Sequence, residues 1–117
     1  MKWWLGAVFL GLVALGTLAV LLLPGGKVEV TIVNVGTTPL RSVTVHVTGN
    51  SYPIGDIAPG AGKTVRVAAK GESHVELQHD GSPDRLVVDC YFEPGYRGKI
   101  TAEVTATQVI HVDNETR

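Results

Sequence analysis

The side chains best suited to recognising a partner lie in one short segment, Tyr91 to Gly98. It reads Tyr-Phe-Glu-Pro-Gly-Tyr-Arg-Gly and so combines aromatic, acidic and basic groups with two glycines. Tyrosine and arginine are enriched among residues that dominate binding energies at protein interfaces. The sequence therefore predicts a partner-binding site formed by Tyr91, Glu93, Tyr96 and Arg97. The alternative is a structural turn in which Tyr96 only covers the edge of the core.

The four histidines are a second possible source of chemistry: His46, His74, His79 and His111. His74 and His79 are separated by an odd offset, which puts them on opposite faces of a strand. His46 and His74 fall on outward positions, where they can meet across neighbouring strands. The spacing matches no zinc motif. We therefore expect solvent-facing histidines and no metal site, with a His46–His74 metal site as the alternative.

Calcium binding and catalysis find little support in the remaining polar residues. Asp80, Asp84 and Asp89 flank one loop, but their spacing does not match the dense ligand pattern of a calcium loop. Cys90, the only cysteine, shares strand parity with apolar neighbours and is expected to point into the core. No serine occupies a nucleophile-elbow motif. We expect no catalytic residues, no enzyme activity and no cofactor.

The elements that must position these side chains are β-strands. Valine, isoleucine and threonine alternate with polar residues over short runs, and Gly, Pro, Asn or Asp separate these runs at intervals of about 8–12 residues. The pattern predicts an all-β, seven-stranded antiparallel sandwich over residues 27–112, followed by a polar tail over 113–117. The most apolar strand, 85–92, is expected at the centre of a sheet. The predicted strands cover 28–32, 40–48, 52–57, 63–69, 73–78, 85–92 and 99–106, with the pattern persisting to 112.

Three segments of this region carry a resemblance to a known class of domain. They read Asn-Val-Gly-Thr-Thr-Pro-Leu at 34–40, Ile-Gly-Asp-Ile-Ala-Pro-Gly at 54–60 and Thr-Val-Arg-Val at 64–67. This order resembles the immunoglobulin-like β-sandwich modules of bacterial extracytoplasmic proteins over about residues 28–79. The resemblance implies an immunoglobulin-like fold without shared catalytic residues. The chain lacks the cysteine pair and the sandwich Trp of antibody domains.

An uncharged apolar run from Trp3 to Leu23 precedes the β region. At about 1.5 Å rise per residue, a helix of this length crosses the ~30 Å hydrocarbon core of a bilayer. The sequence thus predicts a single N-terminal transmembrane helix, with residues 1–26 as anchor and short linker. The alternative is a signal peptide cleaved after Thr17-Leu18-Ala19.

Within the predicted helix, small residues at Ala7, Gly11 and Ala14 form a face that allows another helix to approach closely. Lys2 and the preceding amine favour a cytoplasmic N-terminus, although the positive-inside comparison with Lys27 and Arg41 is close. We therefore expect a single-pass protein of a bacterial inner membrane, with its β domain periplasmic or extracellular.

The charge pattern limits the partners. Ten Lys and Arg against eleven Asp and Glu give a net charge of −1, and the cations do not cluster along the sequence. Nucleic-acid binding usually requires a basic stripe, so it is not expected. The expected partners are the bilayer, through residues 3–23, and another membrane or envelope protein. The predicted function is a non-catalytic interaction module, an accessory subunit of a membrane complex; the alternative is a metal- or glycan-binding module of the cell envelope.

Overall fold

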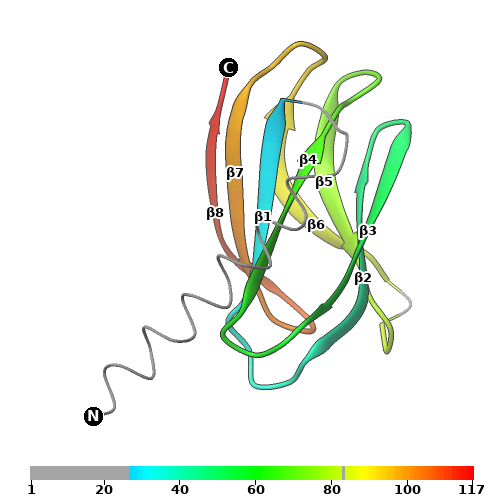
Figure 1. Ribbon diagram of the computed structural model, residues 1–117, viewed down its shortest axis with the longest axis vertical. Coiled ribbons are helices and arrows are strands. Elements are labelled where there is room, and N and C mark those ends of the chain that lie inside the picture. Colours follow the sequence, from blue (N-terminus) through cyan, green and yellow to red (C-terminus); the bar gives the residue numbers. More distant parts are fainter. Residues whose placement is uncertain (1–26, 83) are drawn as a thin grey trace.

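The computed structural model describes residues 27–82 and 84–117, and these residues form eight β-strands (Figure 1). The strands are β1 (Val28–Asn34), β2 (Leu40–Val47), β3 (Asn50–Ile57), β4 (Gly62–Val67), β5 (Ser73–Gln78), β6 (Leu86–Phe92), β7 (Gly98–Val104) and β8 (Val109–Thr116). The predicted anchor, with Ala7, Gly11 and Ala14, lies outside the described residues. Within the described residues, no helix is long and apolar enough to cross a membrane.

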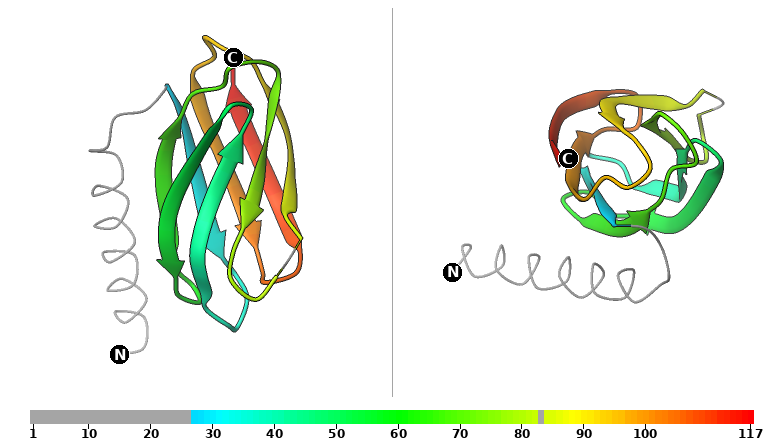
Figure 2. Two further views of the ribbon diagram at one scale, coloured as in Figure 1. Left: turned by 90° about the vertical axis from the view of Figure 1, so that its right-hand side faces the viewer. Right: turned by 90° about the horizontal axis from the view of Figure 1, so that it is seen from above.

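The strands form two four-stranded sheets, with orders β4-β1-β7-β8 and β3-β2-β5-β6. The sheets lie face to face and curve around a common core, as the view along the strands shows (Figure 2). The predicted all-β, two-sheet fold is therefore confirmed. Neighbouring strands are antiparallel except β1 and β7, which pair in parallel. A fully antiparallel sandwich was thus the wrong expectation, because hydrophobic alternation reports which face is buried and not the direction of the neighbouring strand.

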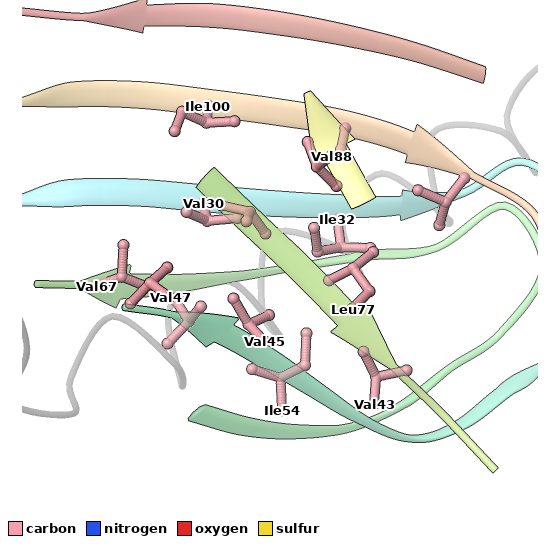
Figure 3. Close-up of a cluster of buried hydrophobic side chains, with 14 of the residues drawn as sticks. Val30, Ile32, Val43, Val45, Val47, Ile54, Val67, Leu77, Val88 and Ile100 are labelled. Atoms are coloured by element: carbon pink, nitrogen blue, oxygen red, sulfur yellow. The ribbon is translucent and has the colours of Figure 1, made fainter. Parts of the chain in front are cut away.

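The core fills the space between the two sheets. Strand β1 shows why the sequence folds this way, since its buried and half-buried residues alternate without exception. Burying each large aliphatic side chain contributes about 1.5–3 kcal/mol. Figure 3 shows side chains from both sheets meeting in this layer: Val30, Ile32 and Ile100 from one, and Val45, Leu77 and Val88 from the other.

Strand β8 is the one that the seven-strand prediction missed. A tight turn separates it from β7, because Thr105 N–H donates to Gln108 O at 2.8 Å and Thr105 Oγ1 accepts from Gln108 N–H at 3.1 Å. Residues 113–117 are not a tail, since β8 continues to Thr116. None of its residues is fully buried, so the alternation that reveals other strands is absent here.

The open edges of the two sheets are joined by side-chain hydrogen bonds. Between β4 and β3, Lys63 Nζ donates to Ile54 O at 3.0 Å. Between β8 and β6, Asn114 Nδ2 donates to Tyr91 O at 3.2 Å. These bonds use backbone carbonyls that would otherwise be exposed along sheet edges.

Asn34 explains why the Asn-x-Gly sequence occurs at the end of the first strand, where Asn34 is the last residue of β1. Its side chain is fully buried. Nδ2 donates to Thr38 O at 2.8 Å and to Ile57 O at 3.0 Å, while Oδ1 accepts from Gly36 N–H at 3.0 Å. One amide therefore closes the β1–β2 connection and ties it to the end of β3.

The connections between strands lie at two ends of the sandwich. One end, called here the Lys27 end, holds the start of β1, the β2–β3 turn, the β4–β5 and β6–β7 connections and the end of β8 (upper end in Figure 1). Lys70 N–H donates to Thr48 O at 3.0 Å, which joins two of these connections. Lys27, the first residue that the structure describes, lies at this end.

Candidate partner-binding site

A tight turn in the β6–β7 connection positions the predicted site residues. Tyr96 N–H donates to Glu93 O at 3.1 Å, and Gly95 has a φ of 91°. Pro94 and Gly95 occupy the two central positions, which fits a type II turn with proline first and glycine at the positive φ. The turn places Tyr96 against the edge of the core at the Lys27 end.

Two tyrosines meet across this turn. The rings of Tyr91 and Tyr96 have centroids 6.4 Å apart and are inclined by 83°, an edge-to-face arrangement. Tyr96 Oη donates to Glu93 Oε2 at 3.5 Å. The structure therefore brings together three of the four predicted residues, although they come from the end of β6 and from the following loop. Tyr91 remains 50% exposed.

The phenol of Tyr91 remains protonated well above neutral pH. Desolvation raises its pKa to about 12, with further contributions from hydrogen bonding to Glu93 and from the charges of Glu72 and Glu93. A neutral phenol with a half-exposed ring offers a partner both an apolar face and a hydrogen-bond donor.

Arg97, the fourth predicted residue, belongs to another surface. It is exposed and borders an open hollow on the outer face of the β4-β1-β7-β8 sheet, with Lys27, Glu29, Arg66 and Lys99. Tyr96 packs against the core, and the next residue along an extended chain points the other way. The structure therefore does not bring Arg97 together with the two tyrosines, and its contact with a partner stays a prediction.

Val87 extends the tyrosine site along β6. It is 56% exposed and lies four residues before Tyr91, on the same face of the strand. The two residues border one surface hollow, which is lined by Glu72, Ser73, His74, Val87, Cys90 and Tyr91. We call Val87, Tyr91, Glu93 and Tyr96 the tyrosine face.

The position of β6 explains why sequence reasoning missed Val87. The strand was expected at the centre of a sheet because it is so apolar, but it is an edge strand that pairs with β5 alone in its sheet. Its register with β5 shifts between Ser73 and Val75: Ser73 pairs with Phe92, while Val75 pairs with Val88. Strand β6 therefore bulges beside β5, a feature common in strands at the edge of a sheet. The sequence signal that could have identified Val87 is an apolar residue at an outward-facing position of a strand.

His46 and His74 do reach one face, as the metal alternative required. They border a hollow with Thr48, Glu76 and Arg85. Each imidazole is engaged by a neighbour, however: His46 Nε2 lies 3.0 Å from Gln78 Oε1, and His74 Nε2 lies 2.7 Å from Glu76 Oε2. Hydrogen bonds from His74 and then Arg85 lower the pKa of Glu76. In residues 27–82 and 84–117, no group of three or more His, Cys, Asp or Glu is arranged to hold a metal.

His79 is not solvent-facing, contrary to the sequence expectation. It is only 8% exposed, with Nδ1 2.7 Å from Asp80 O and Nε2 2.9 Å from Ala106 O. The imidazole therefore fastens the end of β5 to the β7–β8 turn. Contacts with loops bury His79, and the alternation of residues along a strand does not predict such contacts. Cys90, by contrast, is buried as its parity predicted.

Comparison with known proteins adds a family but no activity. A search of curated proteins finds no match to the chain. The model of one family, described as a domain of unknown function (DUF8725), matches residues 19–113. Because this match spans most of the sequence, including all strands up to the middle of β8, the chain belongs to the DUF8725 family.

Proposed function

We propose that this protein is a non-catalytic interaction module, held at a membrane by residues 3–23, that docks another membrane or envelope protein through the tyrosine face. The observation that carries the proposal is the composition of β6. An edge strand needs few apolar residues on its outer side, yet β6 exposes both Val87 and Tyr91. Clustered apolar groups on an otherwise polar surface are typical of protein interaction sites.

The composition of the tyrosine face favours a protein partner. Tyrosine supplies a large contact area with little loss of side-chain entropy, and it recurs among the residues that dominate interface energies. Edge-to-face packing holds Tyr91 and Tyr96 in one arrangement before a partner arrives. Pre-ordered side chains lower the entropic cost of association.

The chain length between the apolar run and the domain supports a partner at the membrane. Leu23 and Lys27 are four residues apart, a span of at most about 14 Å. Tyr96 and the loop that carries it lie at the Lys27 end. With residues 3–23 across an inner membrane and Lys2 on the cytoplasmic side, the tyrosine face stands close to the outer surface of the bilayer. A docking face close to the bilayer surface suits an accessory subunit of a membrane complex.

We also propose that the domain is an immunoglobulin-like module at the level of architecture. Two facing sheets of short strands and the buried Asn34 of the Asn-x-Gly segment support this grouping. The strand order differs from that of antibody domains, whose first two strands share a sheet; here β1 and β2 lie in opposite sheets. Sandwich domains commonly share the architecture without sharing the order.

The proposal is tested by recovering the tagged full-length chain from native membranes in mild detergent and identifying bound proteins by mass spectrometry. Three versions are compared: the natural chain, Val87→Ser/Tyr91→Ser, and the control Val35→Ser, which changes an exposed valine that follows β1, a strand of the other sheet. We expect a stoichiometric partner with the natural chain and the control, at least about tenfold depleted with the double variant.

Equal recovery of the partner by all three versions would overturn the role of the tyrosine face. Recovery of the chain alone would overturn docking to a protein. The intact mass of the recovered chain tests the anchor separately, because cleavage of a signal peptide removes the apolar run.

A further inference from the structure

The outer face of the β4-β1-β7-β8 sheet carries charged residues in register. Arg66 pairs with Glu29, Glu29 with Lys99, and Lys99 with Glu115 across the four strands. Charges therefore alternate in sign along this row, and Arg66 Nη2 lies 3.8 Å from Glu29 Oε1. Opposite charges on adjacent strands stabilise the pairing, and the row as a whole is neutral.

The next row towards the Lys27 end is not neutral. Arg97 and Arg117 exchange both backbone hydrogen bonds, at 2.9 and 3.0 Å, so they stand directly opposite each other. Lys27 precedes the Val28–Gly98 pair and so falls level with Arg97, while β4 contributes Ala68 at this level. Lys27, Arg97 and Arg117 are all exposed. We call these three cations the basic row.

A hollow opens between the two rows. Its walls are Lys27, Glu29, Arg66, Arg97, Gly98 and Lys99, which makes four cations against one carboxylate. Gly98 has no side chain that could fill the hollow. Sequence reasoning found no cluster of cations because these residues are far apart in the chain, and only the parallel pairing of β1 with β7 brings Lys27 to Arg97.

We propose that the basic row binds the phosphate of anionic phospholipid headgroups. Lysine and arginine are the side chains that bind phosphate, the arginines through paired N–H groups. The proposal rests on the membrane attachment proposed above, because Lys27 then lies at most about 14 Å along the chain from the end of the apolar run. Each cation close to an anionic surface strengthens binding about fivefold, so three together contribute about 100-fold.

This inference gives the domain a fixed orientation. Attachment through the chain before Lys27 leaves the domain free to rotate, whereas phosphate contacts by the basic row hold one face of the Lys27 end against the bilayer. Val87 and Tyr91 of the tyrosine face belong to β6, in the other sheet, and stay accessible to a partner. Glu93 and Tyr96 lie in the β6–β7 loop and border a hollow with Lys27, so this part of the face stands beside the basic row.

The experiment uses the full chain in a neutral mild detergent, titrated with phosphatidylglycerol or phosphatidylcholine and followed by native mass spectrometry. The natural chain is compared with Lys27→Gln/Arg97→Gln/Arg117→Gln. The matched control, Arg41→Gln/Lys70→Gln/Arg85→Gln, removes three exposed cations outside the row and has the same net charge. Melting temperatures verify that both triple variants are folded.

We expect phosphatidylglycerol to bind the natural chain at least about tenfold more tightly than phosphatidylcholine, a preference that disappears in the basic-row variant and persists in the control. Equal binding of the two lipids by the natural chain, or equal losses in both triple variants, would overturn the proposal. Inorganic phosphate is titrated in parallel, and displacement of the lipid at comparable phosphate concentrations would assign the row to soluble phosphate instead. The Val87→Ser/Tyr91→Ser variant should retain the lipid preference, so failure of this proposal and failure of partner docking are separable.

Discussion

The ring of Tyr96 stands nearly perpendicular to the ring of Tyr91, with their centroids 6.4 Å apart. The contact links the end of β6 to the loop before β7, and it fixes the shape of the tyrosine face. Edge-to-face pairs of this kind contribute about 0.5–1.5 kcal/mol beyond the area they bury. A double-mutant cycle of Tyr91→Ala and Tyr96→Ala, measured by urea unfolding, should therefore give a coupling energy in this range. A coupling near zero would mean that the two rings are not ordered against each other in solution.

Asn34 should be the most sensitive polar position in the fold. Asn34→Ala removes the donor of a buried hydrogen bond to Ile57 O and of a partly buried one to Thr38 O, and a buried polar group left unsatisfied costs about 1–3 kcal/mol. We expect a loss of about 2–5 kcal/mol in the free energy of unfolding, with Asn34→Asp at least as damaging because a carboxylate would face both carbonyls. The exposed Asn114 is the matched control. Asn114→Ala should cost less than about 1.5 kcal/mol, and equal losses at the two sites would contradict the structure.

Gly98 should not tolerate a side chain. Its φ is 123°, and a Cβ there would overlap the backbone carbonyl of Glu115 on β8. Gly60 also has a positive φ, of 80°, but open space surrounds its Cβ position. Gly60→Ala should cost only the conformational penalty of about 1–2 kcal/mol, whereas Gly98→Ala should cost clearly more and disturb the β7–β8 pairing. Thermal unfolding of both variants checks this, and similar losses would show that β8 is not packed against Gly98.

The pH dependence of stability should show the environment of Tyr91. Its pKa is raised from 10.0 to about 12 in the folded state, so folding favours the protonated phenol. This contribution is fully present below pH 10 and is lost as the pH rises through about 12. Urea unfolding at intervals across this range should show falling stability with a shallower fall in Tyr91→Phe. Identical stability profiles for the natural chain and Tyr91→Phe would contradict the raised pKa of Tyr91 in the folded state.

The sequence predicts the interior of this fold better than its edges. Strict alternation identified β1 and the inward side of Cys90, because a two-residue period is directly visible wherever one face is buried. Alternation did not predict strand β8 or the edge position of β6, because both depend on which strands become neighbours. The parallel pairing of β1 with β7 is of the same kind.

The candidate site could be predicted from the sequence only in part, for the same reason. Tyr91, Glu93 and Tyr96 are close in sequence, and one turn suffices to gather them. Arg97 is equally close, but it borders a different hollow, on the outer face of the β4-β1-β7-β8 sheet. The basic row joins residues that flank three strands, and His79 is buried by a loop far away in the chain. Contacts of this kind follow from tertiary packing and leave no local signal.

The most direct test of partner docking is site-specific photo-cross-linking in intact native membranes. A photoreactive phenylalanine analogue replaces Tyr91 in the full-length chain, and in a second version it replaces Val35, which follows β1 of the other sheet. The account predicts one dominant cross-linked protein from position 91, the same protein that the natural chain recovers in mild detergent, and little or none from position 35. Cross-links from position 91 to lipid alone, or equal products from both positions, would contradict the claim that the tyrosine face docks a protein.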